Sequence, residues 1–264
     1  MNNVMGEIKS LCDKAKLAPL YHALQLQEAS SEWIDSSFSE RLRGLLEAQV
    51  DNEATRKISR LRKSACLRWP QASLADFKTN AELPVTFAKL KDIGQCHWIQ
   101  EFRHIVITGP TGAGKTHLAC AVGDVAIMQG HSVLYYHYQK LIRDLKIAEK
   151  AGDEELEKLR KKLASIKVLI LDDWGIQQLT SVERHLLFEL IELRDQNGSL
   201  IITSQYAPAD WYDAFSDKTV ADSTLDRILP YAIQLRWAEN ASSYRDLRGR
   251  RLTGKVNKQG GNDE

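Results

Sequence analysis

The segment at residues 109–116 reads Gly-Pro-Thr-Gly-Ala-Gly-Lys-Thr and matches the spacing G-x-x-x-x-G-K-[ST]. It follows an apolar run at residues 104–107 and precedes a helical pattern at residues 118–122. Glycines let the backbone turn its N–H groups toward phosphate oxygens, and the start of the next helix adds the positive end of its dipole. A strand, a glycine-rich loop and a helix in this order predict a nucleoside triphosphate site in an α/β domain.

The loop residues have expected roles at the nucleotide. Lys115 is expected to reach the β- and γ-phosphates, and the hydroxyl of Thr116 to hold Mg²⁺. A glycine-rich turn that matches by chance is the alternative, but the flanking strand and helix are the context that the motif requires. The nucleotide-binding residues expected here are Gly109, Pro110, Thr111, Gly112, Ala113, Gly114, Lys115, Thr116 and His117.

Length and composition fit an α/β domain with a smaller appendage. The chain has 264 residues, 43% hydrophobic and 27% charged, as is usual for soluble globular proteins. Its four cysteines contain no C-x-x-C pair, which argues against a zinc site or a disulfide framework. No apolar stretch reaches the roughly 18–20 residues of a membrane span, and no signal-peptide core is present, so we expect a cytoplasmic protein.

The chain is expected to divide near Pro70, which disfavours helix in the residue before it. Upstream, apolar residues recur at helical spacing, which predicts a small all-helical domain at residues 1–68. Downstream, strand-like and helical runs alternate, which predicts a parallel sheet with helices on both faces at residues 69–253. Residues 254–264 have almost no apolar content and are expected to form a disordered tail.

The downstream part contains five expected strands. They lie at residues 105–108, 132–136, 168–171, 199–203 and 232–235. A long helix pair is expected between the second and third strands, and another helix at residues 182–194. The strongly charged segment at residues 140–167 is expected to be a solvated helix.

Two carboxylates follow the third expected strand. A phosphate loop requires an acidic residue on a neighbouring strand to help bind Mg²⁺, and these carboxylates can supply it. Asp172 fits the aspartate that holds Mg²⁺ from a neighbouring strand. Asp173 is then placed to orient or deprotonate the attacking water. An acidic turn after a core strand is the alternative, but the phosphate loop upstream favours the metal site.

Two further polar positions are candidates for catalysis. Gln205 follows the fourth expected strand, whose carboxyl end faces the ligand crevice, so it can sense the γ-phosphate or hold the water. Arg227 can enter a neighbouring subunit's site and stabilise the charge of the transition state. On spacing alone, a surface ion pair with Asp226 explains Arg227 equally well.

Basic residues form two clusters, at residues 56–68 and 245–258, although the net charge is only +1. Local clusters in a near-neutral protein are candidate phosphate contacts for nucleic acid. A solvated helix face and a basic tail explain them as well, so both interpretations stay open.

Taken together, these motifs resemble the IstB-type ATPases, the ATP-binding helper proteins of certain bacterial insertion sequences, which are related to the DnaC and DnaI helicase loaders within the AAA+ class. The resemblance covers about residues 17–252. It is specific because two further segments, Leu-Asp-Arg-Ile-Leu and Ser-Tyr-Arg, accompany the nucleotide motifs in the family's order. The matching segments are residues 109–116, 169–175, 203–205, 225–229 and 243–245.

The resemblance implies an AAA+ P-loop fold with ATP and Mg²⁺ as cofactors. Lys115 and Thr116 match the family's Walker A motif, and Asp172 and Asp173 match its Walker B motif. Gln205 stands where the family usually has the asparagine of sensor 1. The additional methylene of glutamine can displace its hydrogen bond, which puts the rate of hydrolysis in doubt more than ATP binding.

Four more positions match residues of the family. Arg227 aligns with the arginine finger, and Arg245 resembles a sensor 2 arginine. Trp98 and Ile99 match an aromatic-aliphatic pair near the adenine pocket, although core packing explains them equally well. The few residues left after Arg245 do not suffice for the separate helical lid of many AAA+ proteins.

The resemblance also implies a function. An oligomer with active sites at its subunit interfaces would assemble on duplex DNA with ATP, deform the DNA and present it to a partner transposase, and hydrolysis would drive disassembly. The candidate DNA contacts are Arg56, Lys57, Arg60 and Lys63. Two alternatives stay open: a loader that binds a replicative helicase and single-stranded DNA, and a nucleotide-regulated DNA-binding scaffold with little turnover. A small-molecule kinase is disfavoured because no second substrate-pocket signature is present.

Overall fold

The computed structural model describes residues 2–77, 84–175, 177–215, 217–241 and 244. Within the chain, two compact units are distinguished, Met1–Arg60 and Leu61–Glu264. The division falls inside a single helix, α3 (Phe38–Ala65). The domain boundary expected at residue 68 therefore stays a prediction.

The first unit is built from helices, as its apolar spacing predicts. Helix α1 (Asn2–Ala15) is followed by α2 (Ala18–Ala29), which has a proline in its first turn, where a missing N–H costs least. A short 3-10 helix, η1 (Ser31–Trp33), precedes α3. The buried Gln27 side chain of α2 donates to the carbonyl oxygen of Arg41 in α3 at 2.9 Å.

Five parallel strands form the sheet of the second unit, in the order β2-β3-β4-β1-β5. This confirms the predicted fold class, and each expected strand lies within one residue of an observed one at either end. The strands are β1 (His104–Thr108), β2 (Val133–His137), β3 (Val168–Asp172), β4 (Ser199–Ser204) and β5 (Ala232–Arg236).

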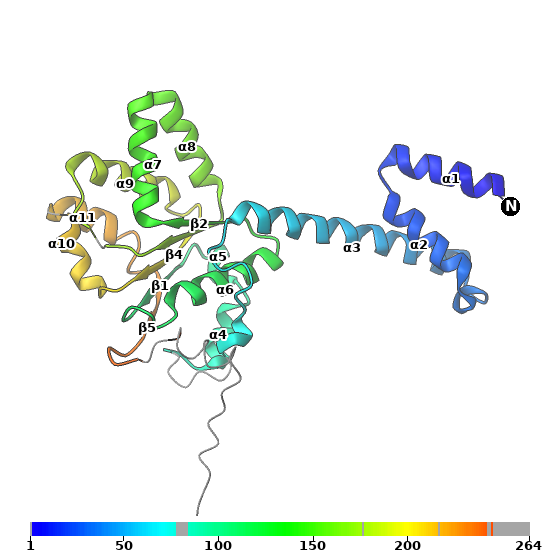
Figure 1. Cartoon of the computed structure of the whole chain (residues 1–264), viewed down its shortest axis with the longest axis horizontal. Helices are drawn as coiled ribbons and strands as arrows, with labels where there is room; N and C mark the ends of the chain where they lie inside the picture. The colour runs from blue at the N-terminus through cyan, green and yellow to red at the C-terminus, as the bar shows by residue number, and fades with distance from the viewer. Residues whose placement is uncertain (1, 78–83, 176, 216, 242–243, 245–264) are drawn as a thin grey trace, which may run out of the picture. The chain divides into compact units, whose positions relative to one another are not determined.

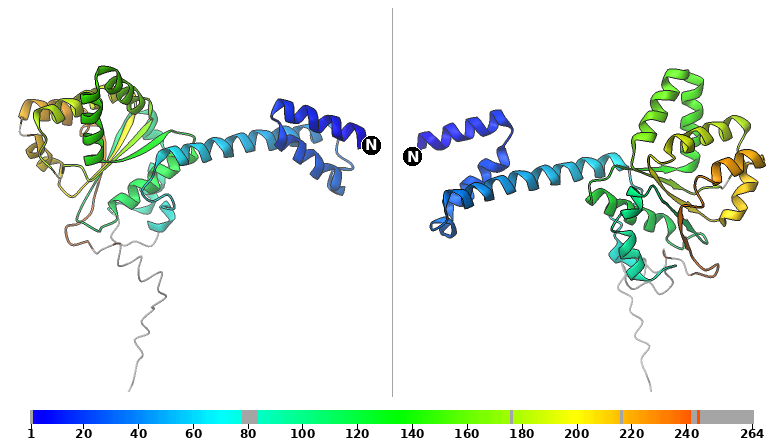
Figure 2. Two further views of the ribbon diagram at one scale, coloured as in Figure 1. Left: turned by 45° about the horizontal axis from the view of Figure 1, so that its top comes forward. Right: turned by 180° about the vertical axis from the view of Figure 1, so that it is seen from behind.

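Helices cover both faces of this sheet, as Figure 1 and the two views of Figure 2 show. Helix α6 packs on one face, and α7, α9 and α11 lie on the other. No helix among the described residues is both long and apolar enough to cross a membrane. The helices of this unit are α4 (Phe87–Ile93), α5 (His97–Gln100), α6 (Lys115–Met128), α7 (Tyr138–Ala151), α8 (Asp153–Ser165), α9 (Ser181–Arg194), α10 (Tyr212–Phe215) and α11 (Lys218–Leu225), with 3-10 helices η2 (Leu74–Phe77) and η3 (Pro208–Trp211).

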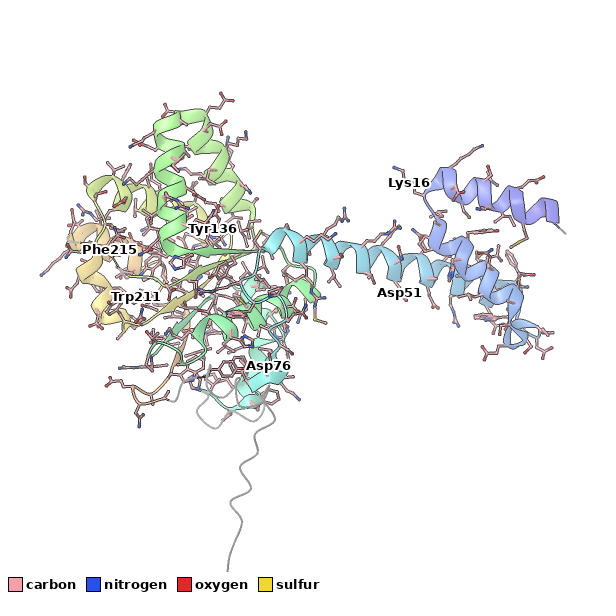
Figure 3. The ribbon with its side chains drawn as sticks, in the orientation of Figure 1. Lys16, Asp51, Asp76, Tyr136, Trp211 and Phe215 are labelled. Atoms are coloured by element: carbon pink, nitrogen blue, oxygen red, sulfur yellow. The ribbon has the colours of Figure 1, made fainter. Side chains whose placement is uncertain are left out.

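Each face of the sheet packs against its own set of helices. Successive residues of a central strand contribute to opposite faces, because their side chains point alternately to either side. Leu169 and Leu171 of β3 join the core cluster formed with α7 to α11. Trp211 and Phe215, labelled in Figure 3, are wholly buried in the same cluster. On the opposite face, a Cβ at Gly123 of α6 would lie 2.9 Å from Cδ1 of Ile170, so glycine lets α6 approach the sheet closely.

The charged segment at residues 140–167 differs from the solvated helix that its composition predicts. Gly152, with φ of 120°, separates α7 from α8, and the two helices pack on each other and on α9. Leu141, Leu145 and Leu163 are completely buried. The prediction was wrong because leucines at helical spacing face the core, while most of the charged side chains lie on the outer face.

His104, the first residue of β1, joins three parts of the second unit. Its Nδ1 accepts the backbone N–H of Leu200 at 3.1 Å, so its Nε2 carries the proton and donates to the carbonyl oxygen of Arg227 at 3.1 Å. Burial lowers the pKa of His104 to about 4 from an ordinary value of 6.5. The ring is therefore neutral at physiological pH.

This burial predicts a pH dependence of stability. The unfolded chain takes up the His104 proton near pH 6.5 and the folded protein only near pH 4, so the unfolded state binds more protons between these values. The contribution of His104 to the free energy of unfolding is complete above pH 6.5 and decreases as the pH falls toward 4, by about 3 kcal/mol at most.

Urea unfolding of the wild type and of His104→Gln at several pH values between 4 and 8 measures this contribution. The wild type should lose stability more steeply than the variant as the pH falls through this range. His185→Gln is the control, because the His185 side chain is 70% exposed. An equal acid dependence in the wild type and His104→Gln would contradict the assignment.

Candidate active site

Three adjacent strands end at the same edge of the sheet. The order β3-β4-β1 places the end of β3, the end of β4 and the start of the loop at residues 109–116 side by side. Thr108 of β1 is in register with Ser204 of β4, and the N–H of Gly109 donates to the carbonyl oxygen of Ser204 at 3.3 Å. Residues predicted from distant parts of the sequence therefore meet here.

The loop needs glycine at two positions, where φ is positive and a Cβ would lie close to an aromatic residue. At Gly109, with φ of 148°, a Cβ would lie 2.6 Å from Cβ of Trp237. At Gly114, with φ of 101°, a Cβ would lie 3.1 Å from the ring of Tyr244. The first N–H groups of α6 have no partner inside the helix and are available to an anion such as phosphate.

Lys115 lies inside the loop. Its side chain is mostly buried, and its Nζ donates to the carbonyl oxygens of Gly109 at 2.8 Å and Pro110 at 2.9 Å. Burial lowers the pKa of Lys115, and the charges of Asp173 and Asp172 oppose this shift. The ammonium group is therefore held at the centre of the loop, where bound phosphates would replace its carbonyl partners.

The carboxylate of Asp172, at the end of β3, is completely buried and has four partners. Its Oδ1 accepts the hydroxyl groups of Thr203 at 2.6 Å and Thr116 at 2.8 Å. Its Oδ2 accepts the phenol group of Tyr135 at 2.6 Å and lies 3.5 Å from Nη1 of Arg68. Burial and this hydrogen bond to Asp172 raise the pKa of Tyr135.

The oxygens at this point suit Mg²⁺. The Thr116 hydroxyl and the Asp172 carboxylate are in contact, and both are hard oxygen ligands. Mg²⁺ in proteins usually takes one or two carboxylates and completes its coordination with substrate phosphates and water. The residues present therefore fit a magnesium ion beside the phosphate loop.

Asp173 has an unusual backbone conformation. Its φ is 61°, in the left-handed region, and its N–H donates to the hydroxyl of Thr203 at 3.1 Å. Its Oδ2 lies 3.2 Å from Nε2 of His137 at the end of β2. Strained residues of this kind persist where their surroundings hold them and are frequent at active sites. The Asp173 carboxylate and the His137 imidazole therefore lie side by side at the ends of β3 and β2.

Gln205 touches the loop directly. Its Oε1 accepts the hydroxyl of Thr111 at 2.7 Å. Glutamine therefore reaches the edge of the site in spite of its additional methylene. Its role toward the γ-phosphate or the water stays a prediction.

Of the two predicted arginines, Arg227 has its contacts away from this edge. Arg227 has Nη2 3.2 Å from Glu192 and its guanidinium 5.2 Å from the ring centroid of Phe188, so its ion-pair partner is Glu192 of α9 and not Asp226. None of the contacts of Arg227 with other described residues involves the phosphate loop. Arg245 lies outside the described residues.

The predicted adenine neighbours are core residues. Trp98 and Ile99 of α5 are 3% and 4% exposed, and the indole N–H of Trp98 donates to the carbonyl oxygen of Ile93 at 3.0 Å. Their contact with adenine stays a prediction. His117, the third residue of α6, lies with Nε2 2.8 Å from Asp76, a residue labelled in Figure 3.

The basic cluster at residues 56–68 contains two kinds of residue. Arg62 forms hydrogen bonds to both carboxylate oxygens of Asp124, at 2.7 and 2.8 Å, and Arg68 lies beside Asp172. These two arginines have structural partners. The four candidate DNA contacts, Arg56, Lys57, Arg60 and Lys63, are exposed.

The sequence analysis missed Thr203, Tyr135, His137 and Arg68. A hydroxyl or imidazole group near the carboxyl end of an apolar strand is the signal that could have found the first three. No comparable pattern marks Arg68, because its partner is more than a hundred positions away in the sequence.

Comparison with known proteins gives a family match over most of the chain. The profile of a family described as IstB-like ATP binding protein matches residues 10–251. A Pseudomonas fluorescens relative, named as an ATP-binding protein of insertion sequence IS1162, is 36% identical over 190 residues, or 72% of this chain and 81% of the relative. A Pseudomonas aeruginosa relative, named for insertion sequence IS21, is 29% identical over 255 residues, or 96% and 94%.

Solved structures agree with the fold. The DnaC helicase loader superposes with a TM-score of 0.55 at 24% identity, covering 65% of this chain and 99% of DnaC. DnaA from Aquifex aeolicus bound to AMPPCP gives a TM-score of 0.56 at 20% identity, covering 71% and 56%. These likenesses confirm the predicted α/β fold, a parallel sheet with helices on both faces.

The position of Thr203 predicts a specific effect on hydrolysis. Thr203→Val removes the hydroxyl that binds both Asp172 and the backbone of Asp173, so the two carboxylates lose their fixed arrangement. The rate constant kcat for ATP hydrolysis should fall roughly 10- to 100-fold, equivalent to about 1–3 kcal/mol for a lost buried hydrogen bond.

Thr224→Val is the matched control. Thr224 is also completely buried, but its hydroxyl donates only within α11, to the carbonyl oxygen of Val220 at 2.7 Å. Each variant loses one buried hydroxyl hydrogen bond, and only Thr203→Val should lose kcat. Equal rates in the two variants would contradict a role of Thr203 in the site.

Proposed function

The chain belongs to the family of IstB-like ATP-binding proteins, and from this premise we propose that it is an ATPase that assembles on duplex DNA and presents that DNA to a partner transposase. The observation that carries the proposal is the meeting of Lys115, Thr116, Asp172 and Asp173 at one edge of the sheet. The relatives' association with insertion sequences supports transposition as the process. We expect the protein to act in the cytoplasm.

The loop and Lys115 bind the phosphates of ATP in this proposal. Backbone N–H groups at the start of α6 and the ammonium of Lys115 contact the phosphate oxygens. Thr116 and Asp172 would hold Mg²⁺, which would supply positive charge beside the phosphate oxygens. Thr203 and Tyr135 keep the Asp172 carboxylate in place during this exchange of partners.

Asp173 is the residue proposed to act on the attacking water. Its carboxylate orients the water and accepts a proton at an Oδ atom, and His137 lies close enough to share that proton. Gln205, bound to Thr111 of the loop, holds the water or the γ-phosphate through its side-chain amide. In this proposal the loop binds the phosphates of ATP, and residues at the ends of β3 and β4 activate the attacking water.

Arg227 is proposed to act in a neighbouring subunit. Its guanidinium is partly exposed and lies beside Glu192 and Phe188 of α9. None of its contacts with described residues involves the phosphate loop of its own chain. A finger supplied by a neighbour makes each active site an interface between subunits. ATP then stabilises the oligomer by mass action, and hydrolysis loosens it. Arg245 is proposed as a second arginine at the nucleotide.

DNA binding is expected to depend on Arg56, Lys57, Arg60 and Lys63. Their exposed charges are available to the phosphates of the duplex. Each Lys or Arg contact that neutralises a phosphate releases counterions, so the affinity should fall as salt increases. The transposase partner rests on the family relationship alone.

The proposal predicts ATP-dependent binding to duplex DNA. Purified protein should bind a long duplex more tightly with ATP than with ADP or without nucleotide, and should form large assemblies on it. Lys115→Ala should abolish the dependence on ATP, because the loop loses its phosphate-binding ammonium. Gel shift and sedimentation with duplex and single strands of equal length measure both effects.

The other outcomes identify the alternatives. Preference for single strands would favour a helicase loader, and ATP-regulated duplex binding without phosphate release would favour a scaffold. Alanine at Arg56, Lys57, Arg60 and Lys63 should weaken duplex binding and lower its salt dependence. Alanine at the exposed Lys158, Lys161 and Lys162 of α8 is the control for the loss of charge.

If Arg227 acts in the active site of a neighbouring subunit, two inactive variants should complement each other in a mixture. Arg227→Ala and Asp173→Asn should each hydrolyse ATP very slowly when alone. An equal mixture should recover roughly a quarter of the wild-type rate, because random mixing unites an intact site with a neighbour's intact finger at about one interface in four. A mixture as inactive as its components would contradict the assignment of Arg227.

A further inference from the structure

The segment at the end of α3 and just after it contacts α6 and extends one side chain, Arg68, to Asp172. We call residues 61–72 the strap. Arg62 pairs with Asp124 of α6. Burial raises the pKa of the Cys120 thiol of α6, and the nearby strap backbone at Trp69 and Arg68 opposes this shift. The ring centroid of Trp69 lies 6.2 Å from that of His117.

The three contact points on α6 belong to one face of that helix. Positions 117, 120 and 124 are separated by three and four residues, the spacing of neighbours on a helix surface. The strap therefore follows α6 from Asp124 back toward Lys115 and the phosphate loop. Ala65 and Ala72 of the strap are buried, at 0% and 3% exposure.

Arg68 extends from the strap to the buried carboxylate of Asp172. Its Nη1 lies 3.5 Å from Oδ2, and the neighbouring Tyr135 raises the pKa of Arg68. The same Oδ2 accepts the phenol hydrogen of Tyr135 at 2.6 Å. A buried carboxylate is costly without a cation nearby, so this arginine contributes to the stability of the nucleotide-free site.

The two residues of this ion pair, Asp172 and Arg68, differ in how tightly their surroundings hold them. Asp172 is completely buried in β3 and is held by three hydroxyl groups. The Arg68 side chain is 47% exposed and belongs to an irregular segment that begins at Cys66, with φ of 51°. When a second cation competes for this carboxylate, Arg68 is the partner that can move.

We propose that Arg68 is a built-in cation that Mg²⁺ displaces from Asp172, so that the strap changes its contacts when magnesium and nucleotide bind. This inference rests on the proposed magnesium site. Lys63, a candidate DNA contact, lies in the strap between the Arg62 pair and Arg68. The strap thus gives the nucleotide site a direct chain connection to a surface proposed to bind DNA.

The first test measures competition for the carboxylate. Binding of AMPPCP, which is not hydrolysed, is followed by calorimetry over a series of Mg²⁺ concentrations. Arg68→Gln should lower the half-saturating Mg²⁺ concentration roughly three- to tenfold, because the competing charge is removed. Arg62→Gln, which breaks the neighbouring pair with Asp124, should leave it unchanged. An unchanged or higher requirement in Arg68→Gln would overturn the proposal.

The second test follows the strap itself by hydrogen exchange and mass spectrometry. In the wild type, AMPPCP with Mg²⁺ should increase amide exchange at residues 66–72 compared with AMPPCP and a chelator. In Arg68→Gln, exchange there should be high in both conditions. Equal exchange in the wild type with and without Mg²⁺ would overturn the coupling of the strap to the site.

The two proposals fail in different ways. Wild-type AMPPCP binding that is independent of Mg²⁺ would remove the magnesium site, and the inference with it. Mg²⁺-dependent binding that is identical in the wild type and Arg68→Gln would leave the proposed site intact and overturn only the role of Arg68.

Discussion

The structure depends on one buried carboxylate. Asp172 at the end of β3 accepts hydroxyl groups from Thr116 on α6, Thr203 on β4 and Tyr135 on β2. A buried charge is tolerated only when it is paired and hydrogen-bonded, so these side chains are required for stability as well as for chemistry. The carboxylate thereby joins the phosphate-loop helix to both strands beside β3. Residues that would bind the metal also hold the edge of the sheet together.

The partners of this carboxylate have different mechanical properties. Thr203 and Tyr135 are in the sheet and move only with its strands. Arg68 belongs to the strap, which is held mainly by side-chain contacts to α6. If Mg²⁺ displaces Arg68 as proposed, the hydroxyl groups of the sheet would keep the carboxylate in place while its cationic partner changes.

Much of the fold was predictable because its signals are local. The strand boundaries follow from apolar runs, and the loop follows from glycines at positions such as Gly114, where φ is positive. Predictions that concerned contacts in space were less successful. The segment at residues 140–167 was expected to be solvated, yet it packs on α9, and Arg227 pairs with Glu192 and not with Asp226. The charge of a segment and the spacing of its residues do not determine which other helix it packs against or which residue it pairs with.

The sequence by itself determined the strand, loop and helix around Lys115 and the two carboxylates at the end of the third strand. These depend on periodicity and on glycine conformation, which are properties of neighbouring residues. Only the tertiary structure decided which groups surround Asp172. Tyr135, Thr203 and Arg68 come from separate segments and meet because β3 lies between β2 and β4 and the strap lies along α6. The order of strands and the path of a connecting segment arise from packing across the whole unit, and no short pattern encodes them.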